Sequence, residues 1–350
     1  MTFLLSFDSE LAGVVAVLLI WYSPNIGAYH IKAYTETMAY LNSQLQKRID
    51  EKFYRLQGLR PLPVDKVKKL REQFTVEMTY NSNAIEGNSL TLKETFFVIS
   101  EGITIKGKPL KDHLEAKDHQ EALGYLYDLA DQKKQSDILE MTIRNLQKLV
   151  VKETASDIAG SYRTGNVIIG GASHCPPDAF EVPNLMRNAV NWINANEGKM
   201  HPVEFAALAH HKIVYIHPFF DGNGRTARLL MDLLLMRAGF PLAVVLKNDR
   251  KKYYQTLEQA DKEKFSPFVD FIARAVERSL DIYLNVLLPV TSKNQKYFSL
   301  SEIAKSTPYS EKYLNLLARQ GKIDAHKDGR NWRVSLGSIK NYIKNRQRQR

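Results

Sequence analysis

The sequence predicts a mainly α-helical protein with one small β element and a separate basic module at its C-terminal end. Three observations support this fold class. Apolar residues recur at three- and four-residue spacing through most of the chain, and turn-forming residues interrupt that pattern. After about residue 291 the pattern changes to short helical and strand-like segments. With 350 residues, the chain is long enough for two or three domains and at least one sizeable core.

Helical spacing of apolar residues occurs in several segments of the first 290 residues. These segments are Ala33–Leu59, Val64–Tyr80, His113–Leu129, Ile138–Val151, Val182–Asn194, Pro202–Ile216, Gly224–Ala238 and Pro267–Leu288. Turn residues separate them at Gly58 to Pro63, Gly87-Asn88, Gly102 to Pro109 and Gly170 to Pro177. One interval is strand-like: Tyr162–Ile169 ends in β-branched residues, and Gly170-Gly171 can turn it back as a hairpin.

The N-terminal region contains an unbroken apolar run of twelve residues, Leu11–Tyr22. A membrane-spanning helix needs about 20 such residues. A signal peptide begins with basic residues, whereas here no Lys or Arg precedes Lys32, and Asp8 and Glu10 lie just upstream. We therefore expect a packed or peripheral segment rather than a membrane anchor. A start codon assigned too far upstream is the alternative interpretation.

Cysteine usage limits the kinds of site that the chain can contain. Cys175 is the only cysteine, so neither an internal disulfide nor a cysteine-based zinc site can form. A single free cysteine fits a reducing compartment, and we expect a cytoplasmic protein.

The net charge of +11 is concentrated at the C-terminal end. Residues 291–350 contain 14 Lys and Arg against 4 Asp and Glu, so the rest of the chain is nearly neutral. Clustered positive charge is the usual electrostatic signature of nucleic-acid binding. The alternative is that these charges only keep a small domain soluble.

The basic region reads as a small module that follows a short polar linker, Thr291–Lys296. Two short helices are predicted at Leu300–Lys305 and Ser310–Arg319, spaced as in a helix-turn-helix. Strand candidates Ile323–His326 and Trp332–Val334 flank an Asp-Gly turn, and a last helix is predicted at Ser338–Lys344. This order resembles a winged helix-turn-helix. The residues then expected to contact DNA phosphates are Arg319, Lys322, Lys327, Arg330 and Arg333.

The most informative stretch is His217–Arg228, HPFFDGNGRTAR, between two apolar helical runs. It is predicted to be a loop that opens a helix. Gly222 and Gly224 permit backbone conformations that a Cβ would block, so amide N–H groups can converge on one point. The helix N-terminus adds free donors and a positive dipole end, which together make an anion hole suited to phosphates.

The side chains around this loop supply the remaining chemistry. Arg225 and Arg228 share a helix face and can reach along a polyphosphate. Asp221 is a hard oxygen ligand able to hold Mg²⁺ against phosphate oxygens. His217 can accept a proton near neutral pH. A lone glycine-rich loop is weak evidence, and a His beside Pro and Phe is often a core residue, but here all these groups occur together.

The stretch resembles the signature of the Fic family, HxFx[D/E]GNGRxxR, at every fixed position. The resemblance implies a Fic helical fold with a β-hairpin flap. It implies that AMP moves from ATP to a Tyr, Thr or Ser hydroxyl of a target protein. ATP would contact Gly222, Asn223, Gly224, Arg225 and Arg228. Asp221 would bind Mg²⁺, and His217 would act as the general base.

Further segments extend the resemblance. Ser82–Gly87, SNAIEG, resembles the family's inhibitory helix, which makes Glu86 the inhibitory residue, with Ser82 and Gly87 in its motif. A solvated helix-end acid before a glycine cap is the alternative for Glu86. Gly160–Pro177 resembles the flap that registers the target, through Val167, Ile168 and Ile169.

The region that contacts adenine in related enzymes corresponds to Tyr253, Tyr254 and Leu257, although the tyrosines could instead be packing residues. The likeness to the metazoan endoplasmic-reticulum Fic adenylyltransferase runs from about Glu77 to Leu284. Asp261 departs from it, because that relative has asparagine there, and this puts one nucleotide contact in doubt.

The expected organisation has three parts: residues 1–112 with the inhibitory helix at about 77–90, a Fic catalytic domain at 113–290, and the winged module at 297–350. In relatives the inhibitory glutamate can also support removal of AMP, and related proteins often form homodimers. Two other functions stay open: a Fic enzyme that transfers UMP, phosphocholine or a phosphate, and a DNA-binding regulator with a silent Fic core.

Overall fold

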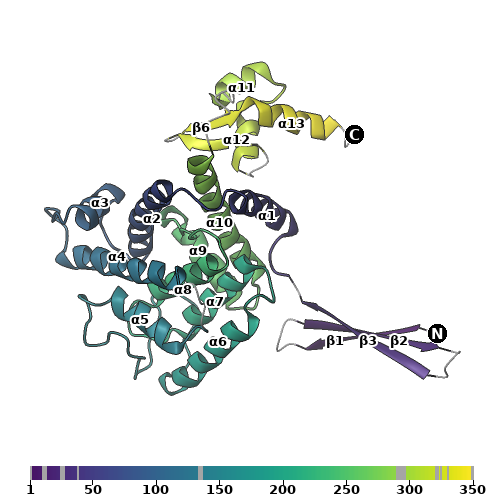
Figure 1. Cartoon of the computed structure of the whole chain (residues 1–350), viewed down its shortest axis with the longest axis horizontal. Helices are drawn as coiled ribbons and strands as arrows, with labels where there is room; N and C mark the ends of the chain where they lie inside the picture. Colours follow the sequence, from purple (N-terminus) through teal and green to yellow (C-terminus); the bar gives the residue numbers. More distant parts are fainter. Residues whose placement is uncertain are drawn as a thin grey trace. The chain divides into compact units, whose positions relative to one another are not determined.

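The computed structural model describes residues 2–9, 14–23, 28–37, 39–132, 137–288, 297–319, 323, 325–328 and 331–347 (Figure 1). The chain divides into two compact units, Met1–Leu287 and Leu288–Arg350. Each unit is described by itself. The expected linker Thr291–Lys296 lies outside the described residues.

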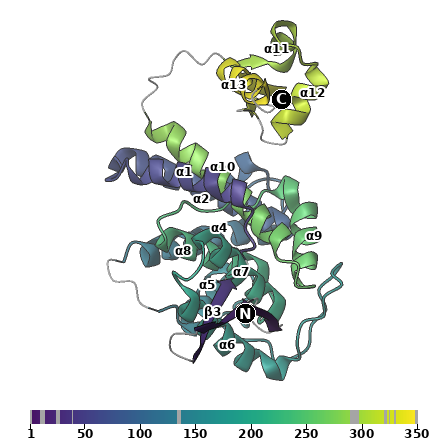
Figure 2. The same cartoon turned by 90° about the vertical axis from the view of Figure 1, so that its right-hand side faces the viewer.

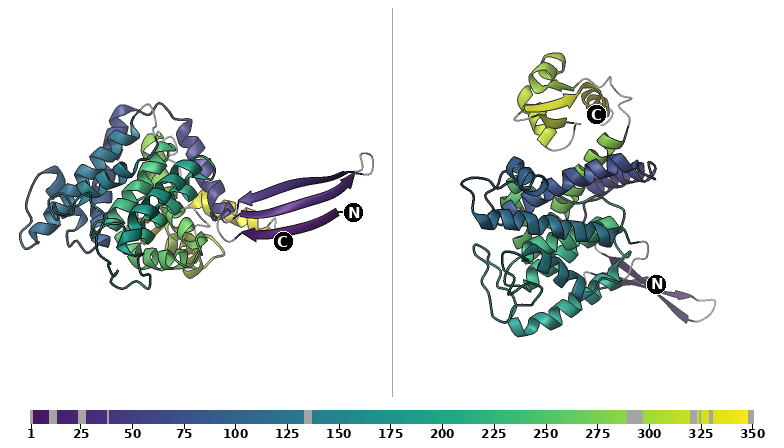
Figure 3. Two further views of the ribbon diagram at one scale, coloured as in Figure 1. Left: turned by 90° about the horizontal axis from the view of Figure 1, so that it is seen from below. Right: turned by 60° about the vertical axis from the view of Figure 1, so that its left-hand side comes forward.

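The N-terminal segment forms a three-stranded antiparallel sheet, whereas its last part was predicted to be helical. Strands β1 (Thr2–Ser9), β2 (Val14–Ser23) and β3 (Ala28–Thr37) lie side by side in this order (Figure 3). The segment Ala33–Leu59 was expected to be helical throughout, but its first residues belong to β3 and the helix begins only at Ser43. β3 is rich in β-branched and aromatic residues, which favour strands, and Asn42 caps the helix by accepting hydrogen bonds from two backbone amides.

Helices make up the rest of the first unit, as predicted. They are α1 (Ser43–Gln57), α2 (Val64–Ile85), α3 (Leu92–Ser100), α4 (Leu110–Ala130), α5 (Glu140–Val150), α6 (Val182–Asn196), α7 (Pro202–Ile216), α8 (Asn223–Arg237), α9 (Arg250–Ala260) and α10 (Ser266–Leu287), with short 3₁₀ turns η1 (Ala179–Glu181) and η2 (Lys247–Asp249). The sequence analysis missed α3 and α9, although a capping box of Thr91 and Glu94 marks the start of α3. Among the described residues, none of the helices combines the length and apolar character needed to cross a membrane.

Helices α7 and α8 occupy the middle of this body (Figure 2). α8 contacts α2, α4, α5 and α7, and α7 also contacts α6 and α10. Their side chains are buried around most of the helix, for example in Phe205–Ala209 and Leu229–Leu235. A loop that joins two such helices is held at both ends by the core, so its geometry is fixed by packing.

The second unit contains helices α11 (Leu300–Ser306), α12 (Glu311–Arg319) and α13 (Leu336–Gln347). Strands β4 (Tyr297–Ser299), β5 (Ala325–Asp328) and β6 (Asn331–Ser335) form an antiparallel sheet in the order β4-β6-β5. Strand β4 was not predicted, and α13 begins two residues before the predicted start. Apolar residues from all three helices form the core of the unit with Val334. Its assignment as a winged helix-turn-helix stays a prediction.

Candidate active site

The loop between α7 and α8 has an unusual backbone at the position of the candidate base. His217 follows the last residue of α7 with φ 49° and ψ 58°, in the left-handed region that few non-glycine residues adopt. Its N–H donates to the carbonyl of Ile213 at 3.0 Å, and its own carbonyl accepts from Nε of Arg163 at 2.8 Å. A strained residue held on both sides is typical of a functional position.

The turn at Gly222 and Asn223 is also fixed by close packing and hydrogen bonds. Gly222 has φ +81°, and a Cβ there would lie 3.1 Å from Cγ1 of Val151, so this position needs glycine. The side chain of Asn223 bonds the backbone of Phe219 twice, accepting from its N–H at 2.9 Å and donating to its carbonyl at 2.7 Å. The Asn223 side chain is therefore part of the loop, and only its backbone is free to face a ligand.

No side chain caps the first turn of α8. The N–H groups of a first helical turn have no partner within their own helix. Converging amides at a positive helix end attract anions. The first turn of α8 therefore presents backbone N–H groups that no side chain caps, and its assignment as an anion-binding site built from Gly222, Asn223 and Gly224 stays a prediction.

Arg225 lies almost completely buried beside this helix end. Its Nη2 donates to Oδ1 of Asp221 at 3.2 Å, while among the described residues Nε and Nη1 have no hydrogen-bond acceptor. Buried donors without partners are rare, and a phosphate oxygen would satisfy these two.

Arg228 and Glu86 form an ion pair that joins α8 to the end of α2. Nη2 of Arg228 lies 2.7 Å from Oε1 of Glu86, and Arg228 also donates to the hydroxyl and the carbonyl of Ser82. Burial alone would lower the pKa of Arg228, but the Glu86 carboxylate outweighs it and the pKa is raised. Arg228 is thus a cation that Ser82 and Glu86, both in the predicted inhibitory motif, hold in place.

Glu86 also lies over the anion site itself. It caps the C-terminus of α2, and Gly87 follows with φ +108°. A Cβ built on Gly224 would collide with the Glu86 carboxylate. The alternative of a freely solvated helix-end acid is wrong, because this carboxylate pairs with a buried arginine and closely approaches the first turn of α8.

The environment of His217 keeps its imidazole neutral. Burial lowers the pKa of His217 to about 4, with a smaller opposing effect from the backbone of Val214. A neutral imidazole can accept a proton at physiological pH.

Asp221 is the candidate metal ligand. Its Oδ1 accepts from the N–H of Gly222 at 2.6 Å and from Arg225, and its side chain is 44% exposed. Within the described part of the chain, no group of three or more His, Cys, Asp or Glu side chains could hold a metal ion. Mg²⁺ is often bound by one or two carboxylates together with substrate phosphates, so Asp221 fits that role without a protein cage.

The flap differs from the prediction. Residues 161–177 lie in no strand, so the expected β-hairpin is wrong. Arg163 holds the segment in two ways. It bonds to the signature loop, because its backbone N–H donates to the carbonyl of Pro218 and its guanidinium to that of His217. The guanidinium also donates to the carbonyls of Gly165 and Pro177 within the segment. Ile168 is 93% exposed, and Val167 and Ile169 are half-buried.

The three candidate adenine contacts, Tyr253, Tyr254 and Leu257, differ in their exposure to solvent. Tyr253 is buried, and its hydroxyl bonds Nε2 of His210 at 2.9 Å and lies 3.5 Å from Nη1 of Arg228. Tyr254 is partly exposed beneath Arg250, and Leu257 is buried. Asp261, the departure from the family pattern, pairs with Nε2 of His211 at 2.9 Å. Tyr253 thus supports Arg228, and Tyr254 is the more accessible of the two tyrosines.

Two residues that hold the loop were missed by sequence reasoning: Arg163 and Gln147. Gln147 donates from Nε2 to the carbonyl of Asp221 and accepts from the N–H of Gly160, which ties the flap to the signature loop. Gln147 lies in no recognisable motif, and Arg163 lies in the segment that resembles the flap, but nothing in the sequence indicated that either side chain bonds the signature loop.

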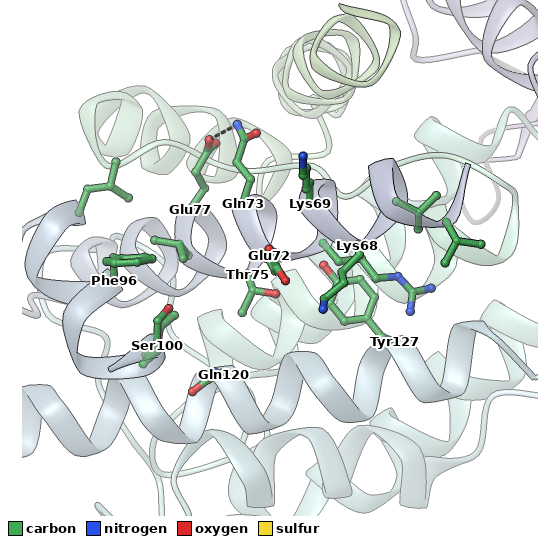
Figure 4. Close-up of a pocket in the computed structure, with 16 residues that line it drawn as sticks. Lys68, Lys69, Glu72, Gln73, Thr75, Glu77, Phe96, Ser100, Gln120 and Tyr127 are labelled. Carbon is green, nitrogen blue, oxygen red and sulfur yellow. Dashed lines mark hydrogen bonds between the residues drawn. The ribbon is translucent and has the colours of Figure 1, made fainter. Parts of the chain in front are cut away.

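A separate cleft of about 1050 Å³ lies between α2, α3 and α4 (Figure 4). Its lining includes Lys68, Gln73, Phe96 and Tyr127, and it includes no residue of the signature loop. It borders a stretch of α2 that precedes the inhibitory motif.

Comparison with known proteins places this site in a family. Residues 137–235 match the Fic/DOC family. A protein adenylyltransferase Fic from Nematostella vectensis is 37% identical over 245 residues, covering 70% of this chain and 56% of that protein. The crystal structure of a Fic-domain-containing signaling protein from Bacteroides thetaiotaomicron superposes with a TM-score of 0.64 and 31% identity, covering 69% of this chain and 96% of that one. Fic-1 from C. elegans superposes with a TM-score of 0.63 and 29% identity, over 69% of this chain and 72% of that one.

The chain belongs to the Fic/DOC family, as the signature predicted. Its helical body is a Fic fold. The chain spans about half the length of the curated relatives it matches.

Proposed function

We propose that this protein is an adenylyltransferase that moves AMP from ATP to a hydroxyl side chain of a target protein and is inhibited by its own Glu86. The observation that carries the proposal is the Glu86–Arg228 ion pair directly over the N-terminus of α8. An arginine able to bind phosphate is thereby blocked by a carboxylate from another helix.

ATP binds with its phosphates at the first turn of α8. Backbone N–H groups of Gly222, Asn223 and Gly224 surround the phosphate oxygens, and Arg225 supports the β-phosphate and the departing pyrophosphate. Two donors of Arg225 support this assignment, because Nε has no hydrogen-bond acceptor among the described residues and Nη1 has only the Glu115 carboxylate at 3.5 Å, without a hydrogen bond. Arg228 binds the γ-phosphate once Glu86 has moved away.

Asp221 would hold Mg²⁺ in this proposal, and the ion would supply positive charge that neutralises the phosphates during transfer. The hydrogen bond from Gly222 fixes one oxygen of Asp221 next to the helix end, so the carboxylate faces the phosphate site.

His217 is the general base. It accepts the proton of a target Tyr, Thr or Ser hydroxyl as that oxygen bonds the α-phosphorus and the bond to pyrophosphate breaks. The hydrogen bond from Arg163 to the His217 carbonyl fixes the backbone from which the imidazole projects.

The low pKa of His217 predicts the acid limb of the pH profile. A base works only when unprotonated, so the activity is present above its pKa and is lost as the pH falls through about 4. For Glu86→Gly, we expect kcat/KM with the magnesium complex of ATP to differ less than about twofold between pH 6 and pH 7.5. A tenfold loss per pH unit starting near the ordinary histidine pKa of about 6.5 would contradict this assignment.

The target docks beside Ile168, and adenine lies near Tyr254 and Leu257. The exposure of Ile168 supports the first assignment, since an exposed apolar side chain is available for contact with a target. In the same site, Glu86 could direct a water that removes AMP from a modified target. Transfer of another phosphate-containing group is the alternative reaction, which competition between nucleotides in a binding assay distinguishes.

Mass spectrometry identifies the target. Lysate of the host cell is treated with ATP and the Glu86→Gly protein, and peptides that gain one AMP on a hydroxyl are sought. The same lysate treated with the Glu86→Gly, His217→Ala protein is the control. Equal modification in both samples would contradict the proposed function.

A second candidate function is DNA binding by residues 297–350, favoured by the excess of ten positive charges in residues 291–350. Arg319 is exposed at the end of α12 and Arg333 lies in β6, whereas Lys322 and Arg330 lie outside the described residues. Retention on DNA should fall steeply between low and high salt, and should disappear when residues 291–350 are deleted. Absent or salt-insensitive binding would indicate that this region contacts protein instead.

We propose that the protein is cytoplasmic, because a single free cysteine fits a reducing compartment, and that it can form homodimers, by analogy with relatives. Sedimentation of the purified chain and fractionation of cells test these two assignments.

A further inference from the structure

Helix α4 brings a buried carboxylate to the phosphate-binding arginine. Oε1 of Glu115 lies 3.5 Å from Nη1 of Arg225, and both side chains are at least nine-tenths buried. Lys111 also approaches this oxygen, at 3.7 Å, but its side chain is largely exposed. Arg225 is thus the buried cation that Glu115 faces.

The other oxygen of Glu115 holds the turn that follows the inhibitory residue. Oε2 accepts from Nδ2 of Asn88 at 2.9 Å, two residues after Glu86. Asn88 is itself fixed, because its N–H donates to the carbonyl of Asn83 at 3.1 Å and its side chain donates to the carbonyl of Asp112 at 3.0 Å. One carboxylate therefore touches both the inhibitory turn and the phosphate site.

Asp221, the second acid at Arg225, is placed differently. It bonds Nη2 from a side chain that is 44% exposed, whereas only 9% of the Glu115 side chain is exposed. Water screens the first interaction far more than the second. Glu115 is therefore the stronger influence on the orientation of the Arg225 guanidinium.

We propose that Glu115 is a positioning residue that holds Arg225 in its phosphate-binding orientation and ties it to the turn after Glu86. The inference rests on the proposed function of the signature loop as a phosphate site. The carboxylate does not touch the substrate. It keeps a buried guanidinium aimed at the place where the phosphates bind, so that ATP binding does not have to order it.

A simpler role for Glu115 would be to anchor the turn alone, and Asp112 provides a matched control for that role. Oδ2 of Asp112 accepts from the N–H of Ser89 at 2.9 Å and from its hydroxyl at 2.6 Å. Asp112 is thus a second buried carboxylate of α4 that holds the same turn, and no described contact joins it to Arg225. Of the two carboxylates, only Glu115 contacts both the turn after Glu86 and the Arg225 guanidinium.

The test compares two isosteric variants in the Glu86→Gly background, where inhibition is already removed. In Glu115→Gln the amide oxygen can still accept from Asn88, but the charge facing Arg225 is lost. We expect the dissociation constant for ATP, measured by calorimetry, to rise about tenfold, because the buried ion pair between Glu115 and Arg225 is lost. KM should rise in parallel while kcat changes less than about threefold.

The control variant is Asp112→Asn, for which we expect an ATP dissociation constant within about twofold of the Glu86→Gly parent. Thermal unfolding checks that both variants are folded. An unchanged ATP affinity in Glu115→Gln, an equal loss in Asp112→Asn, or a fall in kcat without a change in KM would each overturn the inference. If the Glu86→Gly protein binds ATP but transfers no AMP, the proposed function fails, while the binding comparison still decides the role of Glu115.

Discussion

Replacing Glu86 with glycine should raise AMP transfer about 100-fold. The substitution removes the carboxylate that pairs with Arg228 at 2.7 Å and that crowds the first turn of α8. A charge-assisted hydrogen bond to a buried arginine is worth up to about 3 kcal/mol, which corresponds to about two orders of magnitude in rate or binding. The initial rate of label transfer from α-labelled ATP to protein measures the effect.

The chain offers a matched control for this substitution. Glu101 caps the C-terminus of α3 and is followed by Gly102 with a positive φ, just as Glu86 caps α2 before Gly87. No salt bridge among the described residues involves Glu101, so Glu101→Gly should leave the rate near that of the unaltered protein. If AMP transfer by Glu86→Gly were no faster than by Glu101→Gly, Glu86 would not be an inhibitory residue.

Replacing His217 with alanine in the Glu86→Gly background should lower the transfer rate by about 10³-fold or more. General-base catalysis typically contributes factors of about 10² to 10⁴. The affinity for ATP should stay within a few fold, because the imidazole acts on the incoming hydroxyl rather than on the phosphates. Single-turnover transfer and calorimetry with ATP separate the two effects.

The backbone of His217 requires a second variant. Its φ of 49° is strained for alanine, whereas asparagine tolerates the left-handed region. His217→Asn should therefore keep the thermal stability of the parent and still be inactive. Substantial transfer by a folded His217→Asn protein would show that another group takes the proton.

The signature loop could be predicted from the sequence because its parts are close together in the chain. The base, the metal ligand, the glycine turn and both arginines lie within His217–Arg228, where helix geometry and glycine flexibility constrain them directly. Glu86 was found by motif, and the structure places it on Arg228, 142 residues away. The pairing itself could not be derived from spacing, because it depends on how α2 packs beside α8.

The supporting residues could not be predicted for the same reason. Arg163 reaches the His217 carbonyl, Gln147 the Asp221 carbonyl, and Glu115 the Arg225 guanidinium, each from a distant part of the chain. A buried polar residue has no sequence signal until its partner is known.

The errors in the fold prediction also have physical causes. In the N-terminal segment, apolar spacing was compatible with a helix as well as a strand, and the β-branched and aromatic content of β2 and β3 was underweighted. In the flap, where strand pairing was expected, Arg163 instead bonds to His217 of the signature loop and to Pro177 within the flap.

The most direct measurement of the central claim uses the Glu86→Gly protein with ATP labelled at either the α- or the γ-phosphorus. The account predicts that the α-label becomes attached to protein, that the γ-label is released with pyrophosphate, and that His217→Ala abolishes the attachment. Attachment of the γ-label, or attachment of the α-label that persists without His217, would contradict it.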